Sequence, residues 1–97
     1  MSSDDFEVFS SPAFGRKAKK LKKNEKQALD DAVLDILNDP EIGEQKTGDL
    51  SGIYVHKFKI GKQLVLLSYE IEEKEITLIL FGTYENFYRD LKTYRKS

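Results

Sequence analysis

The sequence predicts an α+β domain in which a helical hairpin packs on a small, mainly antiparallel sheet and a short helix closes the chain. Apolar residues recur at helical spacing in the N-terminal part, and they alternate with polar residues at strand spacing in three later segments. A chain of 97 residues, 39% of them apolar, has enough material for one packed domain, so we expect residues 1–97 to form it.

The N-terminal part predicts one strand and two helices. Residues 6–9 alternate apolar and polar side chains, with aromatic and β-branched types among them, which is typical of a short strand. Ser11 followed by proline is a typical helix start, and an apolar stripe at i, i+4 and i+7 continues this helix over residues 12–23. Asn24 is expected to cap a second helix, whose wide apolar stripe stops before Pro40.

The remaining chain predicts three strands and a final helix. Residues 41–52, which contain three glycines, are expected to form a loop. Residues 53–60, 64–71 and 75–81 have strand patterns and are separated by short turns, so they predict a meander. Thr83 is expected to cap the last helix, which gives the order β-α-α-β-β-β-α.

Charge is distributed unevenly, although 16 basic and 17 acidic residues give a formal net charge of only −1. Residues 16–26 carry seven cations and one acid, whereas residues 30–49 carry seven acids and one cation. A row of like charges that cannot pair with one another suits an anionic backbone such as RNA or DNA; the plain alternative is a solvated helix face. The candidate RNA-binding residues are Arg16, Lys19, Lys20 and Lys23, with Arg89 in the last helix.

Composition excludes several classes of function. The chain has no cysteine, so disulfides and thiolate metal sites are ruled out, and its one histidine, His56, is expected to be structural. We expect no metal site and no cofactor. The apolar runs are too short to cross a membrane and no signal peptide is recognisable, so we expect a cytoplasmic protein without membrane contact.

Two lysines in the first strand of the meander are the most informative residues for function. Lys57 and Lys59 are two positions apart, so their side chains leave one face of the strand about 6.6 Å apart. Two such amines can supply a general base and stabilise negative charge on a phosphate. Tyr84 and Tyr88 in the last helix can stack on bases or transfer a proton. The plain alternatives are an exposed sheet face for the lysines and the edge of the core for the tyrosines.

Three sequence segments carry a resemblance to a known superfamily. They are Leu50–Ile60 (LSGIYVHKFKI), Leu67–Tyr69 (LSY) and Leu80–Leu91 (LFGTYENFYRDL), within which the pattern G-x-x-E-N-F-Y ends at Tyr88. With the element order, they resemble the RelE/ParE superfamily of toxins from bacterial type II toxin–antitoxin pairs, and G-x-x-E-N-F-Y is similar to its C-terminal signature. The resemblance covers nearly the whole chain.

The resemblance, with the RelE-like branch favoured, implies a toxin that cleaves mRNA on the ribosome without a metal and so inhibits translation. In such endoribonucleases the 2′-hydroxyl attacks the adjacent phosphate. Carried over residue by residue, the catalytic candidates are Lys57, Lys59, Tyr84 and Tyr88, and the basic helix contacts ribosomal RNA. The implied partners are the ribosome, mRNA and a cognate antitoxin protein, in a toxin–antitoxin complex that binds operator DNA.

Two positions depart from the pattern of the superfamily's ribonucleases. Leu66 stands where an arginine is frequent on the third strand, and Tyr84 stands where the signature usually has arginine or histidine. Two other functions therefore stay open. One is inhibition of DNA gyrase, as in ParE-like members, and the other is a weakened or inactive toxin that acts with its antitoxin as a co-repressor.

Overall fold

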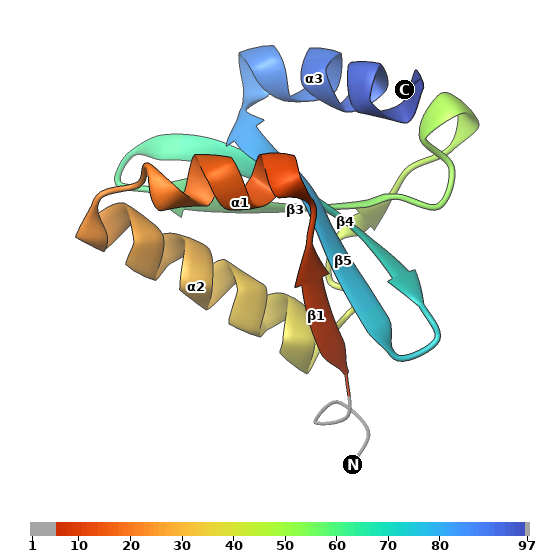
Figure 1. The fold of residues 1–97 in the computed structure, drawn as a ribbon, viewed down its shortest axis with the longest axis horizontal. Helices are drawn as coiled ribbons and strands as arrows, with labels where there is room; N and C mark the ends of the chain where they lie inside the picture. The colour runs from red at the N-terminus through yellow and green to blue at the C-terminus, as the bar shows by residue number, and fades with distance from the viewer. Residues whose placement is uncertain (1–5, 97) are drawn as a thin grey trace.

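The structure is a computed structural model, and it describes residues 6–96. Its elements follow the predicted order, with two short additions before the meander (Figure 1). No helix within the described part of the chain is both long enough and apolar enough to span a membrane. In chain order the elements are β1 (Glu7–Ser10), α1 (Pro12–Lys19), α2 (Lys23–Asn38), β2 (Glu44–Gln45), the 3₁₀ turn η2 (Gly48–Leu50), β3 (Tyr54–Ile60), β4 (Gln63–Glu72), β5 (Glu75–Thr83) and α3 (Tyr84–Lys96).

The strands form one sheet in the order β1-β5-β4-β3-β2. β3, β4 and β5 are the predicted meander, and β2 extends it by antiparallel pairing with β3. β1 forms the other edge and runs parallel to β5, where Val8 pairs with Ile76. This mainly antiparallel sheet with its three helices confirms the predicted α+β fold.

A bulge in β5 shifts which residues face each side of the sheet. Ser68 pairs with Leu80 but the next pair skips Ile79, which is the extra residue. The buried Ser68 hydroxyl accepts a hydrogen bond from the Leu80 N–H (3.1 Å) and donates one to the Leu80 carbonyl oxygen (3.3 Å). Phe81 therefore returns to the face that Leu78 occupies before the bulge.

The start of α1 is the predicted one and ties the helix to the sheet. Pro12 is the first helical residue, and the Ser11 hydroxyl accepts a hydrogen bond from the Phe14 N–H at 3.0 Å. The same hydroxyl donates to the Ile79 carbonyl oxygen at 2.6 Å. One serine thus caps the helix and joins it to β5.

The boundary between the two N-terminal helices differs from the prediction. α1 ends at Lys19 rather than at residue 23, because the Leu21 N–H bonds the Ala18 carbonyl three residues back and tightens the chain into a turn. Asn24 is not the cap of α2. The helix begins after Lys22, whose backbone N–H donates to the Glu25 carboxylate at 2.8 Å, so Glu25 supplies the capping interaction.

Residues 41–52 are not wholly a loop, since they contain β2 and η2. The buried Tyr69 side chain anchors the chain just before β2. Its hydroxyl donates to the Pro40 carbonyl oxygen at 2.6 Å and accepts from the Gly43 N–H at 3.0 Å. A strand of two residues and a single 3₁₀ turn carry too few side chains to produce a periodic pattern.

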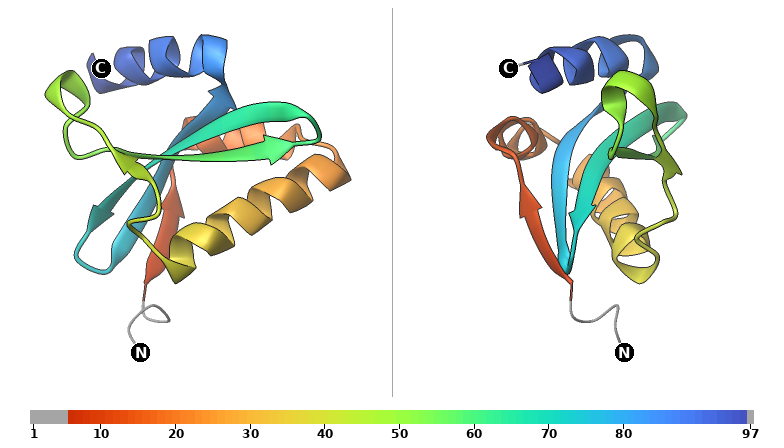
Figure 2. Two further views of the ribbon diagram at one scale, coloured as in Figure 1. Left: turned by 180° about the vertical axis from the view of Figure 1, so that it is seen from behind. Right: turned by 90° about the vertical axis from the view of Figure 1, so that its right-hand side faces the viewer.

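Apolar side chains cover both faces of the sheet, so the domain has two cores. Figure 2 shows α3 continuing from the end of β5, apart from α2. The first core lies between the sheet and helices α1 and α2, and its buried residues are Phe14, Leu29, Ile36, Val65, Leu67, Tyr69, Ile76, Leu78 and Phe81. The second lies under α3 on the other face, which we call the α3 face, and its buried residues are Leu50, Ile53, Val55, Leu66, Ile79, Phe87 and Leu91.

Candidate functional site

The two lysines of β3 lie on the α3 face with both side chains exposed. They follow Val55, which is buried in the second core, at alternate positions along the strand. Lys57 pairs with Leu66 and Lys59 with Leu64 across β4. Both amines therefore leave the α3 face beyond the edge of the second core and reach solvent together, in the geometry that the strand period predicts.

A third lysine, which the sequence analysis did not select, lies on the same face. Lys46 follows β2, and its N–H donates to the Ile53 carbonyl oxygen at 2.8 Å. The Lys46 ammonium lies 5.2 Å from the centre of the Tyr88 ring and 3.3 Å from a carboxylate oxygen of Glu44. Only 21% of the Lys46 side chain is exposed. β2 thus holds a cation against an aromatic ring of the last helix.

These neighbours favour the positively charged form of Lys46. Interaction with the Tyr88 side chain raises the pKa of Lys46, and Glu44 adds to this, while partial burial opposes it. Lys46 is therefore a fixed cation at neutral pH. Residues 44–46 are all polar (Glu-Gln-Lys) and lie in an acidic, glycine-containing segment, so the sequence resembles a loop and contains no signal for this position.

The two tyrosines predicted to act in catalysis lie one helical turn apart at the start of α3. Their ring centroids are 5.9 Å apart and the rings meet edge to face, with an interplanar angle of 73°. Tyr88 also contacts the Phe87 ring, with centroids 4.9 Å apart, and is half-buried at the second core. Tyr84 is 62% exposed. Tyr88 is therefore held on several sides, whereas Tyr84 presents its ring to solvent.

Paired residues on three neighbouring strands connect Lys57 with the start of α3. Lys57 pairs with Leu66, and Leu66 pairs with Gly82, two residues before the helix begins at Tyr84. Because neighbouring strands are ~4.8 Å apart, this row spans about 10 Å. Leu66 is fully buried in the second core, so the position where the superfamily's ribonucleases often carry arginine has no charge here.

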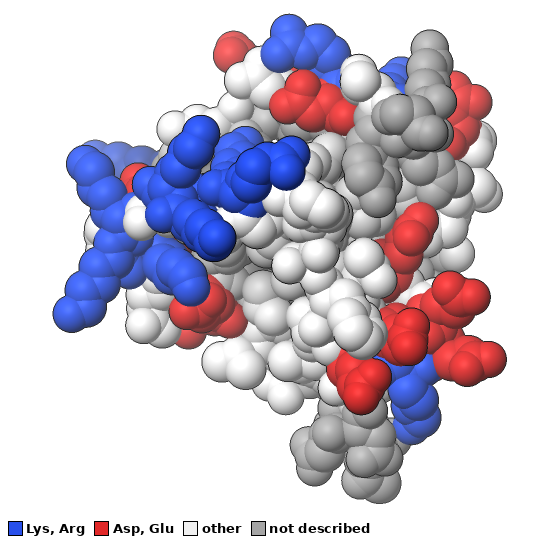
Figure 3. Space-filling model, in the orientation of Figure 1, with Lys and Arg blue, Asp and Glu red and all other residues white. Residues whose placement is uncertain are grey.

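The other candidate RNA-binding residues lie elsewhere on the molecule. Figure 3 shows a dense group of Lys and Arg side chains at the end where α1 meets α2. We call it the basic cluster, and its exposed members are Arg16, Lys19, Lys20, Lys22, Lys23 and Lys26. Because α1 ends at Lys19, the four candidates of the α1–α2 region do not belong to one helix but surround the turn between two helices.

Arg89 lies apart from the basic cluster, on the exposed side of α3. Its guanidinium donates to the Asn86 side-chain oxygen at 3.1 Å and lies 3.8 Å from the Asp90 carboxylate. These neighbours on its own helix offset part of its charge.

His56 lies on the opposite side of β3 from the lysines, near α2. Its Nε2 atom is buried without a hydrogen-bond partner and lies 3.9 Å from the Asp35 carboxylate. Burial lowers the pKa of His56, against the opposing charge of Asp35. In residues 6–96, no group of three or more His, Cys, Asp or Glu side chains is placed to hold a metal ion.

Comparison with known proteins identifies the family. A family model described as the ParE-like toxin of type II bacterial toxin–antitoxin systems matches residues 8–92. No curated protein matches the sequence.

Three solved structures illustrate the similarity of the fold. A double mutant of the Escherichia coli toxin RelE in the free state matches with a TM-score of 0.72 at 18% identity. The match covers 95% of this chain and 97% of the RelE chain. The intact E. coli RelBE toxin–antitoxin complex matches with a TM-score of 0.64 at 21% identity, covering 80% of this chain and 95% of that one. YafQ from E. coli strain BL21(DE3) has a TM-score of 0.59 at 15% identity, with coverages of 86% and 98%. The superfamily resemblance of the sequence is thereby confirmed, and the chain belongs to the ParE-like toxins of type II bacterial toxin–antitoxin systems.

Proposed function

We propose that this toxin is an endoribonuclease that cleaves mRNA on the ribosome and so inhibits translation. The observation that carries the proposal is the exposed pair Lys57 and Lys59 on the face of the sheet that also holds Lys46 against Tyr88. Cations and aromatic rings along one open surface suit the phosphates and bases of single-stranded RNA. The similarity of the fold to RelE supports the branch of the superfamily for which the sequence resemblance implies mRNA cleavage.

The proposed reaction needs no cofactor because RNA carries its own nucleophile. A base removes the proton of a 2′-hydroxyl, and the resulting oxygen attacks the adjacent phosphorus. The bond to the 5′ oxygen of the next nucleotide breaks, and an acid protonates that oxygen. The products are a 2′,3′-cyclic phosphate and a free 5′-hydroxyl, so the protein has to supply a base, an acid and positive charge.

Residues of the α3 face are assigned to these roles. One lysine of the β3 pair is the base, and the other stabilises the negative charge that develops on the phosphate. Tyr84, whose ring is exposed, is the acid. Tyr88 stacks on a base of the substrate, and Lys46 beside it binds a phosphate, which replaces part of the charge that the superfamily's arginine would have supplied.

The basic cluster is the proposed contact with ribosomal RNA, with Arg89 as a further phosphate contact. Because the formal net charge is −1, the molecule as a whole is not drawn to RNA, and binding has to rely on local groups of cations. Such binding weakens steeply with added salt. Charge reversal within the basic cluster is therefore expected to weaken ribosome binding.

The cognate antitoxin is the second proposed partner. The intact RelBE structure is a complex of toxin and antitoxin, and this chain matches 95% of the matched RelBE chain. We assign the same kind of partner to this toxin, with operator DNA as the ligand of the joint complex and the cytoplasm, where translation takes place, as its location.

Alanine variants of the two β3 lysines test the function. Lys57→Ala and Lys59→Ala are expected to lower mRNA cleavage on translating ribosomes by about 100-fold or more, because each removes the base or the charge stabiliser. Both side chains are exposed, so the melting temperature should stay unchanged. Lys62→Ala is the matched control, since Lys62 is an exposed lysine in the turn between β3 and β4. Cleavage at the wild-type rate by both β3 variants would refute the assignment.

Gyrase inhibition is the second candidate function, and the buried Leu66 favours it. The position contributes no cation to a phosphate site, which is unfavourable for an endoribonuclease of this superfamily. The two functions are separated by adding the wild-type toxin to a translation reaction and to a DNA supercoiling reaction. Intact mRNA together with blocked supercoiling would replace the proposed function with this one.

A further inference from the structure

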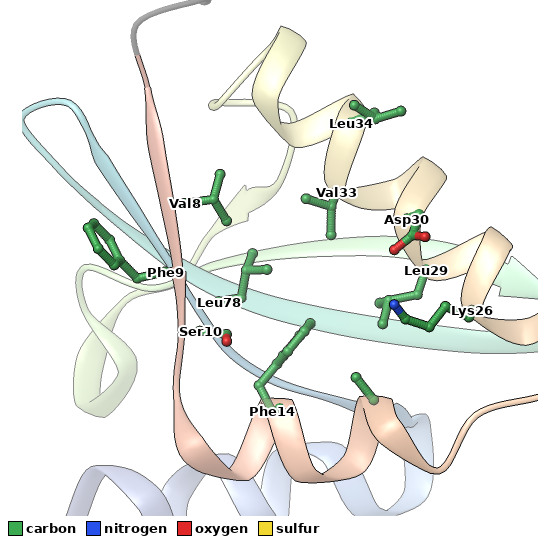
Figure 4. A pocket seen from close by; sticks show the side chains of 12 residues that line it. Val8, Phe9, Ser10, Phe14, Lys26, Leu29, Asp30, Val33, Leu34 and Leu78 are labelled. Atoms are coloured by element: carbon green, nitrogen blue, oxygen red, sulfur yellow. The ribbon is translucent and has the colours of Figure 1, made fainter.

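Two of the pockets in the molecule differ in the kind of ligand that they can hold. Figure 4 shows the first, which lies between β1 and α2 and is lined mostly by apolar side chains, among them Val8, Val33 and Leu78. The second, which we call the polar pocket, lies where the α1–α2 turn, the β3–β4 turn and the start of α3 gather at one end of the molecule (Figure 1). Its volume is about 370 Å³, which is sufficient for a small ligand.

The polar pocket combines an apolar floor with a polar rim. The floor consists of apolar side chains that are buried or half-buried, namely Leu21, Ile60, Val65 and Phe81. The rim carries three exposed side chains that can donate hydrogen bonds, namely Lys17, Gln63 and Asn86. An unpaired nucleobase needs the same two kinds of surface, because its flat faces are apolar and its edge forms hydrogen bonds.

Lys17 reaches the polar pocket from α1, and two contacts position its ammonium group. The Nζ atom donates to the Phe81 carbonyl oxygen at 2.7 Å and lies 5.1 Å from the centre of the Phe81 ring. Among the described residues, no carboxylate forms an ion pair with Lys17. Because an ammonium group has three N–H donors, two of them stay available for the oxygen atoms of a phosphate.

Gly82 leaves the space that the Lys17 ammonium occupies. A Cβ atom at position 82 would lie 2.9 Å from Lys17 Nζ, which is closer than side-chain packing allows. Gly82 is the glycine of the G-x-x-E-N-F-Y pattern, and α3 begins two residues later, at Tyr84. The glycine therefore permits a cation to lie at the start of α3, where the positive end of the helix dipole adds to its charge.

The polar pocket lies around the end of the sheet from the β3 lysines. Ile60 in its floor directly follows Lys59, and Gln63 on its rim pairs with Ile60 across the turn. Because side chains alternate along a strand, Lys59 and Ile60 point to opposite faces of the sheet. Leu21, on the far side of the pocket, belongs to the turn that the basic cluster surrounds. An RNA chain that leaves the β3 lysines around this end of the sheet therefore meets the pocket before the basic cluster.

Glu25 adds a hydrogen-bond acceptor to the lining of the polar pocket. Its Oε1 atom accepts from the Lys22 N–H at 2.8 Å, whereas its Oε2 atom has no donor in the part of the chain that the structure describes. A carboxylate oxygen accepts from an exocyclic amino group, which adenine, cytosine and guanine have and uracil lacks. The chemistry of the lining therefore disfavours uridine.

We propose that the polar pocket binds one nucleotide of the mRNA, next to the segment held by the β3 lysines. Lys17 binds the phosphate of this nucleotide, the apolar floor contacts its base, and Glu25 accepts a hydrogen bond from the amino group of the base. The identity of the ligand as mRNA rests on the proposed function, whereas its size and polarity follow from the pocket itself. The toxin thus prefers certain bases near the cleavage site through residues that take no part in cleavage.

Cleavage of a set of messages on translating ribosomes tests this preference. The messages differ by single bases around one cleavage site, and primer extension gives kcat/KM for each. For the wild type, uridine at one flanking position should lower kcat/KM about tenfold. Glu25→Gln should remove this penalty, because an amide can also donate to uracil while glutamine keeps the capping interaction of α2.

Variants on the rim separate the pocket from general attraction to RNA. Lys17→Met should lower kcat/KM about tenfold on the preferred messages and leave the uridine message nearly unchanged, because that message does not use the pocket. Lys19→Met, which removes a cation of the basic cluster outside the pocket, should lower kcat/KM equally on every message. Gln63→Ala should reduce the preference about threefold, and its exposed neighbour Lys62→Ala is the matched control that should change nothing. Circular dichroism melting checks that each variant is folded.

Titration of the intact toxin with nucleoside 5′-monophosphates, followed by amide NMR, tests the pocket without the ribosome. AMP, CMP and GMP should shift the amide signals of Thr83 and Asn86 at lower concentration than UMP, and Lys17→Met should abolish these shifts. The proposal is overturned if no nucleotide shifts these signals, or if Lys17→Met lowers cleavage by the same factor on every message, as a contact with ribosomal RNA would. Nucleotide binding in the pocket without cleavage of any mRNA would remove the proposed function and support the pocket as a nucleotide site.

Discussion

Tyr69→Phe is the sharpest test of how the fold supports the site, because it deletes a single oxygen atom. That hydroxyl donates to the Pro40 carbonyl oxygen at 2.6 Å and accepts from the Gly43 N–H at 3.0 Å. Tyr69 is fully buried, and the ring itself stays in place in the variant, stacked on Tyr54 with centroids 5.4 Å apart. The substitution therefore changes hydrogen bonding without opening a cavity of side-chain size.

The expected cost follows from the groups that lose their partner. The Gly43 N–H is buried, so it loses its hydrogen bond without access to water, at about 1–3 kcal/mol. The Pro40 carbonyl belongs to a half-buried residue and recovers part of its loss from solvent. We expect the free energy of unfolding to fall by about 2–3 kcal/mol and the melting temperature to fall by roughly 10–20 °C.

A pH profile separates this hydroxyl from other effects. Burial raises the pKa of Tyr69 from its ordinary value of 10.0 to about 12. The folded state therefore binds this proton more tightly than the unfolded state does. The resulting stabilisation is fully present below pH 10 and is lost as the pH rises through about 12. Tyr69→Phe should lack this part of the alkaline loss of stability.

Urea denaturation at pH 7 and across the range from pH 9 to 12 measures both effects. The same variant should also lower the rate of mRNA cleavage, because the chain that Tyr69 anchors leads directly into β2 and Lys46. A variant whose stability at pH 7 stays within about 0.5 kcal/mol of the wild type would refute the reasoning, since that is the range of an ordinary surface substitution.

Substitutions at four further positions have defined expectations. Lys46→Ala should lower the free energy of unfolding by about 0.5–1 kcal/mol through loss of the contact with Tyr88, and Lys46→Arg should restore it in urea melts; no recovery would show that the cation is not responsible. His56 has a pKa lowered by burial, so the folded state binds its proton less tightly and stability should fall as the pH drops below the ordinary value of 6.5. His56→Gln should flatten that acid limb, and an unchanged slope between pH 7 and 5 would contradict the assignment. Gly43→Ala should cost more than about 2 kcal/mol, because its Cβ would lie 2.8 Å from the Tyr69 hydroxyl and 3.1 Å from backbone of β3. Gly82→Ala should cost about 1 kcal/mol, because its Cβ would meet only Lys17 Nζ, at 2.9 Å, and moving that ammonium gives up its hydrogen bond to the Phe81 carbonyl oxygen. Thermal melts that reverse this order would contradict the packing argument.

Elements with long periodic patterns could be predicted from the sequence because tertiary packing and local pattern agree in them. The three strands of the meander are examples, and the placement of Lys57 and Lys59 on one face followed from the strand period alone. The end of α1 could not be predicted, since Leu21 continues the apolar stripe of α1 across the turn that ends it. Periodicity reports which side chains are buried, and it does not report where the backbone turns.

The contribution of Lys46 to the site could not be predicted for a different reason. The position of Lys46 depends on β2, which has only two residues. Pairing with β3 holds β2 in place, and so does the hydroxyl of Tyr69, a residue far along the chain. Its contact with Tyr88 joins two segments that no local pattern relates. The apolar pocket between β1 and α2 has the same character, because its walls come from β1, α1, α2 and β5 and are assembled only by the tertiary fold.

The parallel pairing of β1 with β5 also determines when the protein can fold. The first strand finds its neighbour only after residues 75–83 have been synthesised, and α1 is joined to the sheet through the Ile79 carbonyl in the same late strand. Until then the apolar stripes of α1 and α2 have no complete sheet to pack against. The contacts of β1 and Ser11 with β5 join residues far apart in the sequence, and such contacts form slowly. A nascent chain therefore carries its basic cluster before it carries a site. Lys46 and Tyr88 meet only when α3 has been made, so a product that terminates before α3 lacks the face on which the proposed chemistry depends.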